Sequence, residues 1–238
     1  MLTEEQIKAN KDRFLKLLSE IDLESADTEG LAKFLLESDF FTAPASTKYH
    51  CAFKGGLCQH SLNVYDTLCK LVEDYAWRLE VNPQWVPELG EEQEDPHYIK
   101  KVNYDDYTLK MVALFHDISK ANFYEVYYKN VNKGKDGRDN WVKEANYKVR
   151  EAKDRFLAAD HATNSLLILQ QYLPLSLEES TAIINHHGFT VTDPNRNTEV
   201  SNIFDRYPLV VLLSMADQIS TYVLESKYHE QDIEGTVE

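Results

Sequence analysis

Apolar residues recur with the period of an α-helix through most of this sequence. The clearest case begins at Leu57, after which His60, Val64 and Leu68 fall on one helical face. The segments that fit helices are Thr3 to Leu18, Glu29 to Glu37, Leu57 to Leu79, Tyr107 to Ser119, Asp160 to Tyr172, Leu177 to His187 and Tyr207 to Leu224. The chain is therefore predicted to be predominantly helical.

Two of these helices carry a recognisable start signal. Thr3 with Gln6, and Ser176 with Glu179, have the spacing of a capping box, which satisfies backbone N–H groups at a helix N-terminus. Gly188 is expected to end the helix that begins near Ser176, and a polar loop is expected to follow it.

One part of the chain departs from the helical period. Phe123 to Val131 and Trp141 to Val149 are rich in tyrosine, valine and tryptophan. The stretch NKGKDGRDN between them is rich in glycine, aspartate and asparagine. This pattern predicts a β-hairpin inserted into a helical protein.

The length of 238 residues fits one large domain, and no internal repeat or low-complexity tract divides the sequence. The proline-containing acidic stretch Asn82 to Tyr104 is expected to be a connecting loop. With 43% apolar and 27% charged residues, the composition is typical of a soluble globular protein.

The net charge of −15 constrains the class of partner. A surface this acidic repels polyphosphate chains, so an extended nucleic-acid footprint is not expected. A small phosphorylated substrate remains compatible with the charge, because a local metal cluster can attract it.

The sequence favours a cytoplasmic location. No run approaches the ~18 apolar residues of a membrane span, and the charged N-terminus lacks the pattern of a signal peptide. The cysteines Cys51, Cys58 and Cys69 are odd in number and lack CxxC spacing, which argues against a disulfide framework.

Histidine and aspartate interrupt the apolar helices. His60, His116, His161 and His186 fall on or at the ends of apolar segments. Asp217 lies inside the run LVVLLSMADQIST, where an unpaired carboxylate is costly to bury. Two solutions are open for such a group: a protonated or hydrogen-bonded acid, or a metal ligand.

The pair His116-Asp117 fits a metal site best if it lies at a helix end. Neighbouring residues on a helix point about 100° apart, so both reach one ion more readily where the helix stops. Ser119, Lys120 and Asn122 make such an end plausible. Imidazole and carboxylate ligands suit Zn²⁺, Mn²⁺ and Fe²⁺, and Mg²⁺ where more oxygen ligands are present.

The order of these residues resembles a known signature. His60, then His116-Asp117, then Asp217 is similar to the H…HD…D pattern of the HD-domain metal-dependent phosphohydrolase superfamily. The stretch HDISK resembles that family's HDIGK variant, with Ser119 in place of glycine. The stretches GGLCQHS and NHHG further resemble the HD domain of bacterial 3′–5′ exoribonucleases.

The resemblance spans roughly Tyr49 to Tyr222 and implies an all-α HD-domain helical bundle with an inserted β-hairpin. The expected organisation is a single HD-type domain over 1–238, with an N-terminal helical extension at 1–48, the HD core at 49–222 and the hairpin at 123–149.

The resemblance also implies a ligand set for one or two divalent ions, drawn from Mn, Fe, Zn, Ni and Mg. The ligands of the first metal would be His60, His116, Asp117 and Asp217. Asp117 would bridge to a second metal, whose other ligands would be His161 and His186.

Three further residues have more than one reading. His187 is a third ligand of the second metal, a substrate contact or a polar neighbour. Lys120 resembles the lysine that follows the HD pair, where it neutralises a phosphate or anchors the helix end. His50 either lies at the pocket mouth or is a surface histidine, and a surface histidine is the more common of the two.

The implied activity is hydrolysis of a phosphate ester by metal-activated water. Asp117 would orient the attacking water, with Lys120 and His187 as supporting catalytic residues. The expected substrate is small, phosphorylated and nucleotide-like.

No OB domain precedes the HD region, unlike in the exoribonucleases, so RNA degradation is not expected. No GYP motif of cyclic-di-GMP phosphodiesterases is present, so cyclic-di-GMP is not an expected substrate.

Two other functions remain open. Some HD-fold proteins with the same ligand pattern use di-iron to activate O₂. A catalytically silent, metal-stabilised binding module is the third class, although the complete ligand set argues against it. The hairpin is either a flap, with Tyr124, Tyr127, Tyr128 or Trp141 stacking on a base, or an element whose aromatic side chains pack on the core.

Overall fold

The computed structural model describes residues 1–81, 102–134, 138–156, 158–190 and 194–225. These residues form mainly helices, together with one two-stranded antiparallel sheet. The α-helices are α1 (Glu4–Ser19), α2 (Thr28–Glu37), α3 (Gly56–Val81), α4 (Asp106–Phe115), α5 (His161–Leu169), α6 (Leu177–Ile184), α7 (Pro194–Arg206) and α8 (Pro208–Ile219). The strands are β1 (Tyr124–Asn132) and β2 (Trp141–Val149), and the short helical turns are η2 (Ile118–Lys120), η3 (Ala152–Asp154), η4 (Gly188–Thr190) and η5 (Ser220–Leu224).

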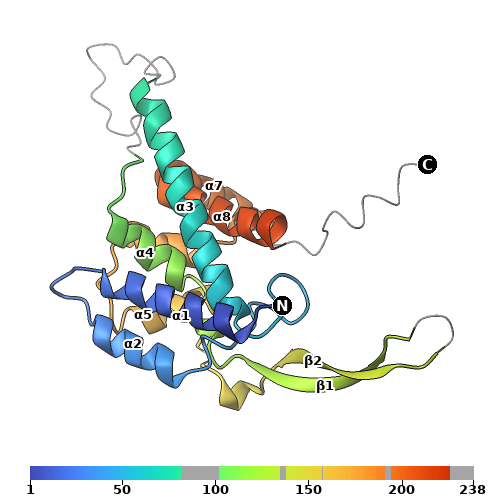
Figure 1. Cartoon of the computed structure of the whole chain (residues 1–238). Helices are drawn as coiled ribbons and strands as arrows, with labels where there is room; N and C mark the ends of the chain where they lie inside the picture. The colour runs from blue at the N-terminus through green and yellow to red at the C-terminus, as the bar shows by residue number, and fades with distance from the viewer. Residues whose placement is uncertain (82–101, 135–137, 157, 191–193, 226–238) are drawn as a thin grey trace, which may run out of the picture.

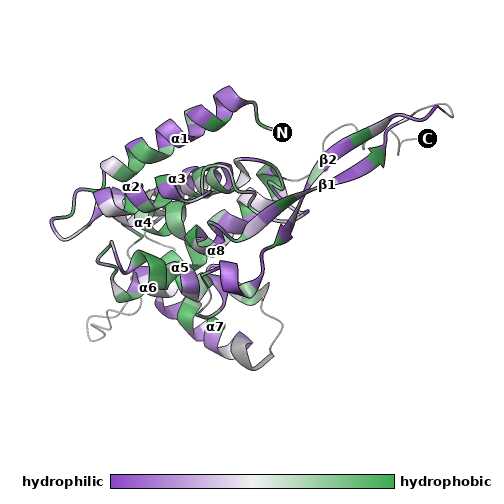
Figure 2. Ribbon diagram, turned by 90° about the horizontal axis from the view of Figure 1, so that it is seen from below, coloured by the Kyte–Doolittle hydropathy of each residue, from purple (hydrophilic) through white to green (hydrophobic). Residues whose placement is uncertain are grey.

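The long helix α3 runs along the middle of the helical body (Figure 1), where it packs against α4 on one side and α8 on the other. Helix α6 packs against α5 and α8, which brings the second half of the chain onto the same core. Figure 2 shows mostly hydrophobic residues along α4, α5 and α8 and a mixture of both kinds along α1. This difference matches the positions of the helices, because every residue of α4 from Thr108 to Phe115 is buried whereas α1 buries only one face.

Four phenylalanines connect the N-terminal segment to the central helices. The ring centroid of Phe14 on α1 lies 5.0 Å from that of Phe40, 5.7 Å from that of Phe41 and 5.4 Å from that of Phe115 on α4. All three contacts are edge-to-face, the geometry that aromatic pairs prefer. The segment 1–48 therefore shares its apolar core with the helices that follow it.

The predicted hairpin is confirmed. Strand β1 pairs with β2 in an antiparallel register that runs from Tyr124 opposite Val149 to Asn132 opposite Trp141. The hairpin projects away from the helices (Figure 1), and Arg150 anchors its base by donating hydrogen bonds to Asp39 and to the carbonyl of Tyr124. Tyr124 is buried there, whereas Tyr128 and Trp141 are exposed and do not pack on the core.

Both predicted capping boxes are present, at Thr3 with Gln6 and at Ser176 with Glu179. Two predicted helices end before the histidines that they were expected to include, however. The helix predicted to reach Ser119 ends at Phe115, and the one predicted to reach His187 ends at Ile184. In each case the chain leaves the helix just before the histidines, so these side chains lie in turns.

Gly188 follows the second of these turns with a φ of +55°. A Cβ at this position would lie 2.6 Å from Ser214 Oγ on α8. Both this close approach and the positive φ therefore require glycine.

The prediction of a polar loop after Gly188 is wrong in part, because α7 occupies 194–206. This helix is polar on its outer side, but it buries Val200 and packs Ile203 and Phe204 against the core. Its few apolar residues made the helical period inconspicuous. The loop predicted from Asn82 lies outside the described residues as far as 101, and 102–105 have no regular structure.

No single helix in the described part of the chain is long and apolar enough to cross a membrane. The pair Asn197–Arg206 and Pro208–Leu224 reaches that length and composition only when the two helices are taken together, and the pair is bent by 113°.

Replacing Phe14 with alanine should lower the free energy of unfolding by about 3–5 kcal/mol, because the substitution leaves a cavity among three other aromatic rings. Urea denaturation measures this loss, and Leu36→Ala, at an exposed position of α2, is the matched control. A loss below about 1 kcal/mol would show that the N-terminal segment does not unfold together with the rest.

Candidate metal centre

Five segments far apart in the sequence bring their histidines and aspartates to one place. His60 lies on α3, the pair His116-Asp117 directly follows α4, and His161 is the first residue of α5. His186 and His187 follow α6, and Asp217 lies on α8. All six predicted metal ligands and His187 belong to groups whose donor atoms are close enough to hold a metal ion.

The first group surrounds one oxygen of Asp117. His60 Nε2 lies 3.2 Å from Asp217 Oδ1, 3.3 Å from His116 Nε2 and 3.8 Å from Asp117 Oδ2. His116 Nε2 lies 3.5 Å from the same Asp117 oxygen. Ligand atoms bound to one ion at ~2.1 Å are about 3–3.5 Å apart, so these four side chains have nearly the spacing of a coordination sphere.

The second group surrounds the other oxygen of Asp117. Asp117 Oδ1 lies 3.8 Å from both His161 Nε2 and His186 Nε2. His187 Nε2 lies 2.5 Å from His161 Nε2, which adds a third imidazole to this side. Asp117 thus directs its two carboxylate oxygens into two different groups of histidines.

Two buried atoms at this junction test whether a cation fits. Asp117 Oδ1 and His186 Nε2 have no hydrogen-bond partner among the described residues, although both side chains are buried. A buried carboxylate oxygen without a partner is costly, and so is an unpaired imidazole nitrogen. A divalent cation accepts electron pairs from both atoms, so the donor set present here fits a metal ion.

Backbone carbonyls fix the orientation of two of the imidazoles. His116 Nδ1 donates to the carbonyl oxygen of Ala113 at 2.8 Å, and His186 Nδ1 donates to that of Ile183 at 2.6 Å. Each bond places the proton on Nδ1 and leaves the lone pair of Nε2 directed toward Asp117. The early ends of α4 and α6 make these bonds possible, because the histidine bends back onto the last helical turn.

His60 is oriented by a carboxylate that the sequence analysis missed. Both oxygens of the buried Glu225 lie 3.1 Å from His60 Nδ1, and Asn63 Nδ2 donates to Glu225 Oε1 at 2.8 Å. Glu225 directly follows η5 and lies beyond the predicted core boundary at Tyr222. Its position two helical turns after Asp217 was the only available signal, since residues at that spacing share a helix face.

The electrostatics favour ionised carboxylates and neutral imidazoles. Burial would raise the pKa of Asp117, but Lys120 and the surrounding imidazoles outweigh it and hold the pKa well below its ordinary value. Burial lowers the pKa of His186 to about 4 and also lowers that of His116 and His161. Deprotonated ligands are the form that binds metal.

His60 differs from the other imidazoles. Burial alone would lower its pKa, but hydrogen bonds to Asp217 and Glu225 outweigh burial and raise the pKa to about 10. A proton and a cation therefore compete for the same nitrogen of His60, as they do at any metal-binding imidazole.

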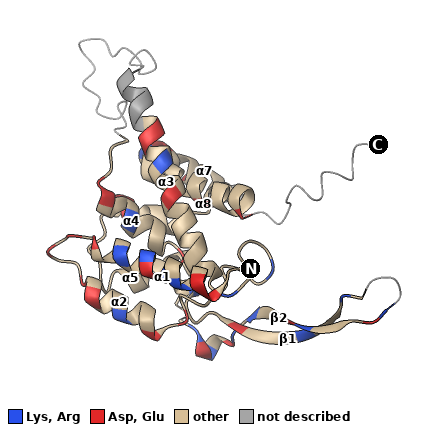
Figure 3. Cartoon of the chain, viewed as in Figure 1, with Lys and Arg blue, Asp and Glu red and all other residues tan. Residues whose placement is uncertain are grey.

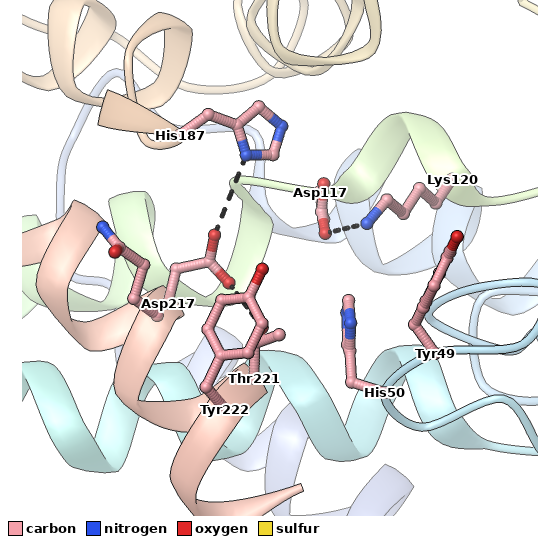
Figure 4. A pocket seen from close by; sticks show the side chains of 9 residues that line it. Tyr49, His50, Asp117, Lys120, His187, Asp217, Thr221 and Tyr222 are labelled. Atoms are coloured by element: carbon pink, nitrogen blue, oxygen red, sulfur yellow. Dashed lines mark hydrogen bonds and ion pairs between the residues drawn. The ribbon is translucent and has the colours of Figure 1, made fainter. Parts of the chain in front are cut away.

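A pocket of about 300 Å³ opens onto the junction (Figure 4). Its lining residues are Tyr49, His50, Asp117, Lys120, His187, Asp217, Gln218, Thr221 and Tyr222. Lys120 Nζ lies 2.5 Å from Asp117 Oδ2, and Figure 4 shows both side chains directed into the pocket. His50 lines the pocket as well, so its position at the mouth is the correct one of its two readings.

Comparison with protein-family models, with curated proteins and with solved structures finds no significant match to this chain.

Glu225→Gln should weaken metal binding by about 10- to 100-fold, because it removes the anion that orients His60 and supports its basicity. Competition with a chelating dye measures the affinity, and Glu37→Gln, at an exposed position on α2, is the control. An affinity equal to that of the wild type would mean that Glu225 does not act through His60.

Proposed function

We propose that this chain is a metal-dependent phosphohydrolase of the HD-domain type, which hydrolyses a phosphate ester of a nucleotide or of a short phosphodiester. The observation that carries the proposal is the position of Asp117. Its Oδ2 lies within 3.8 Å of His60 and His116, and its Oδ1 lies 3.8 Å from His161 and His186. A carboxylate in that position suits a bridge between two cations, the arrangement that two-metal hydrolases use for phosphate esters.

The motif resemblance implies how these residues would divide between two ions. The first ion would be held by His60, His116, Asp117 and Asp217, and the second by Asp117, His161 and His186, with His187 next to His161. Mixed imidazole and carboxylate ligands suit Mn, Fe, Zn or Ni better than Mg, which prefers oxygen. Bound ions of this kind lower the pKa of water and neutralise phosphoryl charge.

Lys120 is the residue best placed to hold the phosphate. Burial would lower its pKa, but the Asp117 carboxylate outweighs burial and raises it, so the side chain is an ammonium group. It lines the pocket next to Asp117, where it can share its protons between that carboxylate and a phosphoryl oxygen. This position supports the catalytic reading of Lys120 over that of a helix-end anchor.

The pocket favours a small ligand with an aromatic part. Its volume of about 300 Å³ is at the lower end of the range for small-molecule sites, ~300–1,000 Å³. Tyr49 and Tyr222 are both exposed and line it, so an aromatic face is available for a nucleobase next to the phosphate position.

The activity test uses bis(p-nitrophenyl) phosphate, a small phosphodiester, with the protein loaded with Mn²⁺, Fe²⁺, Zn²⁺ or Ni²⁺. We expect hydrolysis that a chelator abolishes and that Lys120→Met slows by about 10²- to 10³-fold in kcat, because the variant loses a charge that stabilises the transition state. Lys153→Met, at an exposed position of η3, is the control and should retain full activity.

Two outcomes would overturn the proposal. If the protein hydrolyses neither this ester nor any nucleotide of a panel with any of the four ions, it is not a phosphohydrolase. Oxygen uptake by the iron-loaded protein, without ester hydrolysis, would favour the di-iron oxygenase alternative.

A further inference from the structure

The hairpin carries an exposed apolar surface that hydrolysis at the metal centre does not use. Val126 is 50% exposed, Tyr128 66%, Trp141 65% and Val149 43%. Apolar residues grouped in this way on an element that projects from the body are typical of a binding surface.

The register collects these side chains on one face of the hairpin. Residues directly opposite each other in an antiparallel pair point to the same side, and every second residue of a strand does so too. Tyr128 lies opposite Ala145, Val126 opposite Tyr147, and Asn132 opposite Trp141. We call the face that bears Val126, Tyr128, Lys143, Tyr147 and Trp141 the aromatic face; Tyr127 and Lys148 lie on the other side.

The aromatic face borders two hollows, and the larger one adjoins the pocket at the metal centre. They have volumes of about 620 and 780 Å³, and both are lined by Tyr128, Ala145 and Tyr147. Tyr127 lines neither of them. The larger hollow is also lined by Tyr49, which lines the pocket at Asp117. A ligand held in that pocket therefore has a neighbouring surface along which to extend.

The charge of the hairpin differs from that of the whole chain. From Tyr124 to Val149 the sequence contains six lysine and arginine residues and four acidic residues, whereas the whole chain has 25 basic and 40 acidic residues. Figure 3 shows basic positions on both strands. Lys143 on the aromatic face forms no ion pair with the described residues, while Lys148 on the other face pairs with Glu125.

We propose that the aromatic face, together with Tyr49, binds a short single-stranded oligonucleotide whose end enters the metal-centre pocket. Aromatic side chains next to cations suit such a strand, because every base has a face that stacks and every linkage has a charge. A short strand on the hairpin also avoids the acidic remainder of the surface. The inference rests on the proposed function in that the strand's end carries the phosphate to be hydrolysed.

The test is the affinity for a fluorescein-labelled phosphorothioate oligothymidylate, which resists hydrolysis, measured by fluorescence anisotropy. We expect Tyr128→Ala to raise the Kd about tenfold through the loss of one stacking contact. Tyr127→Ala removes the same kind of side chain from the opposite face and should leave the Kd unchanged. Lys143→Ala should reduce the slope of log Kd against log salt by about one unit, and Lys148→Ala should not change it.

A wild type that does not bind this probe, or an unchanged Kd for both Tyr128→Ala and Lys143→Ala, overturns the inference. So does a wild-type dimer in sedimentation that dissociates in Tyr128→Ala, because the face would then belong to a second copy of the chain. Hydrolysis of bis(p-nitrophenyl) phosphate, which reaches only the pocket, should be the same in Tyr128→Ala and the wild type. If the wild type does not hydrolyse this ester, the proposed function is wrong. The anisotropy measurement then still decides whether the hairpin binds an oligonucleotide.

Discussion

The carboxylate of Asp117 is the group on which the geometry of the candidate metal centre depends. It is buried between two groups of histidines, and Lys120 satisfies only its Oδ2 atom. The neighbouring imidazoles offer Oδ1 no hydrogen bond, because His186 directs an unpaired nitrogen toward it and His161 Nε2 remains 3.8 Å away. An ionised oxygen in those surroundings is costly to bury without a counter-charge, and the buried cluster around it could hold a cation.

The ends of α4 and α6 supply the rest of the surroundings. Both helices stop one or two residues before a histidine, and the histidine returns a hydrogen bond to a carbonyl of the last turn. A helix C-terminus carries partial negative charge on its free carbonyls, which favours a cation nearby. Two such ends therefore add to the charge of Asp117 and Asp217, and they hold the imidazole lone pairs in the direction of the junction.

The polar positions of this cluster could be picked out from the sequence, because burial and polarity conflict at a few positions only, while the resemblance to the HD-domain signature implied that they form one ligand set. His60 lies on the apolar face of an amphipathic helix and Asp217 on a strongly apolar helix, and a polar residue in such a place needs a partner. The hairpin was predictable from its change of period. Two features could not be predicted, because they depend on which residues meet in space. Glu225 contacts His60 on another helix, and Tyr49 lines two hollows. Helix α7 was missed for a local reason, since most of its residues are polar.

We propose that Asp117 joins two bound cations, and the metal content of the purified chain tests this role most directly. The protein would be prepared without chelator or nickel affinity resin and analysed by plasma mass spectrometry, beside Asp117→Ala and the surface control Asp12→Ala. Close to two transition-metal ions per chain in the wild type and the control, and loss of both in Asp117→Ala, is the predicted result. A chain that holds no ion even after incubation with Mn²⁺, Fe²⁺ or Zn²⁺ would contradict the account.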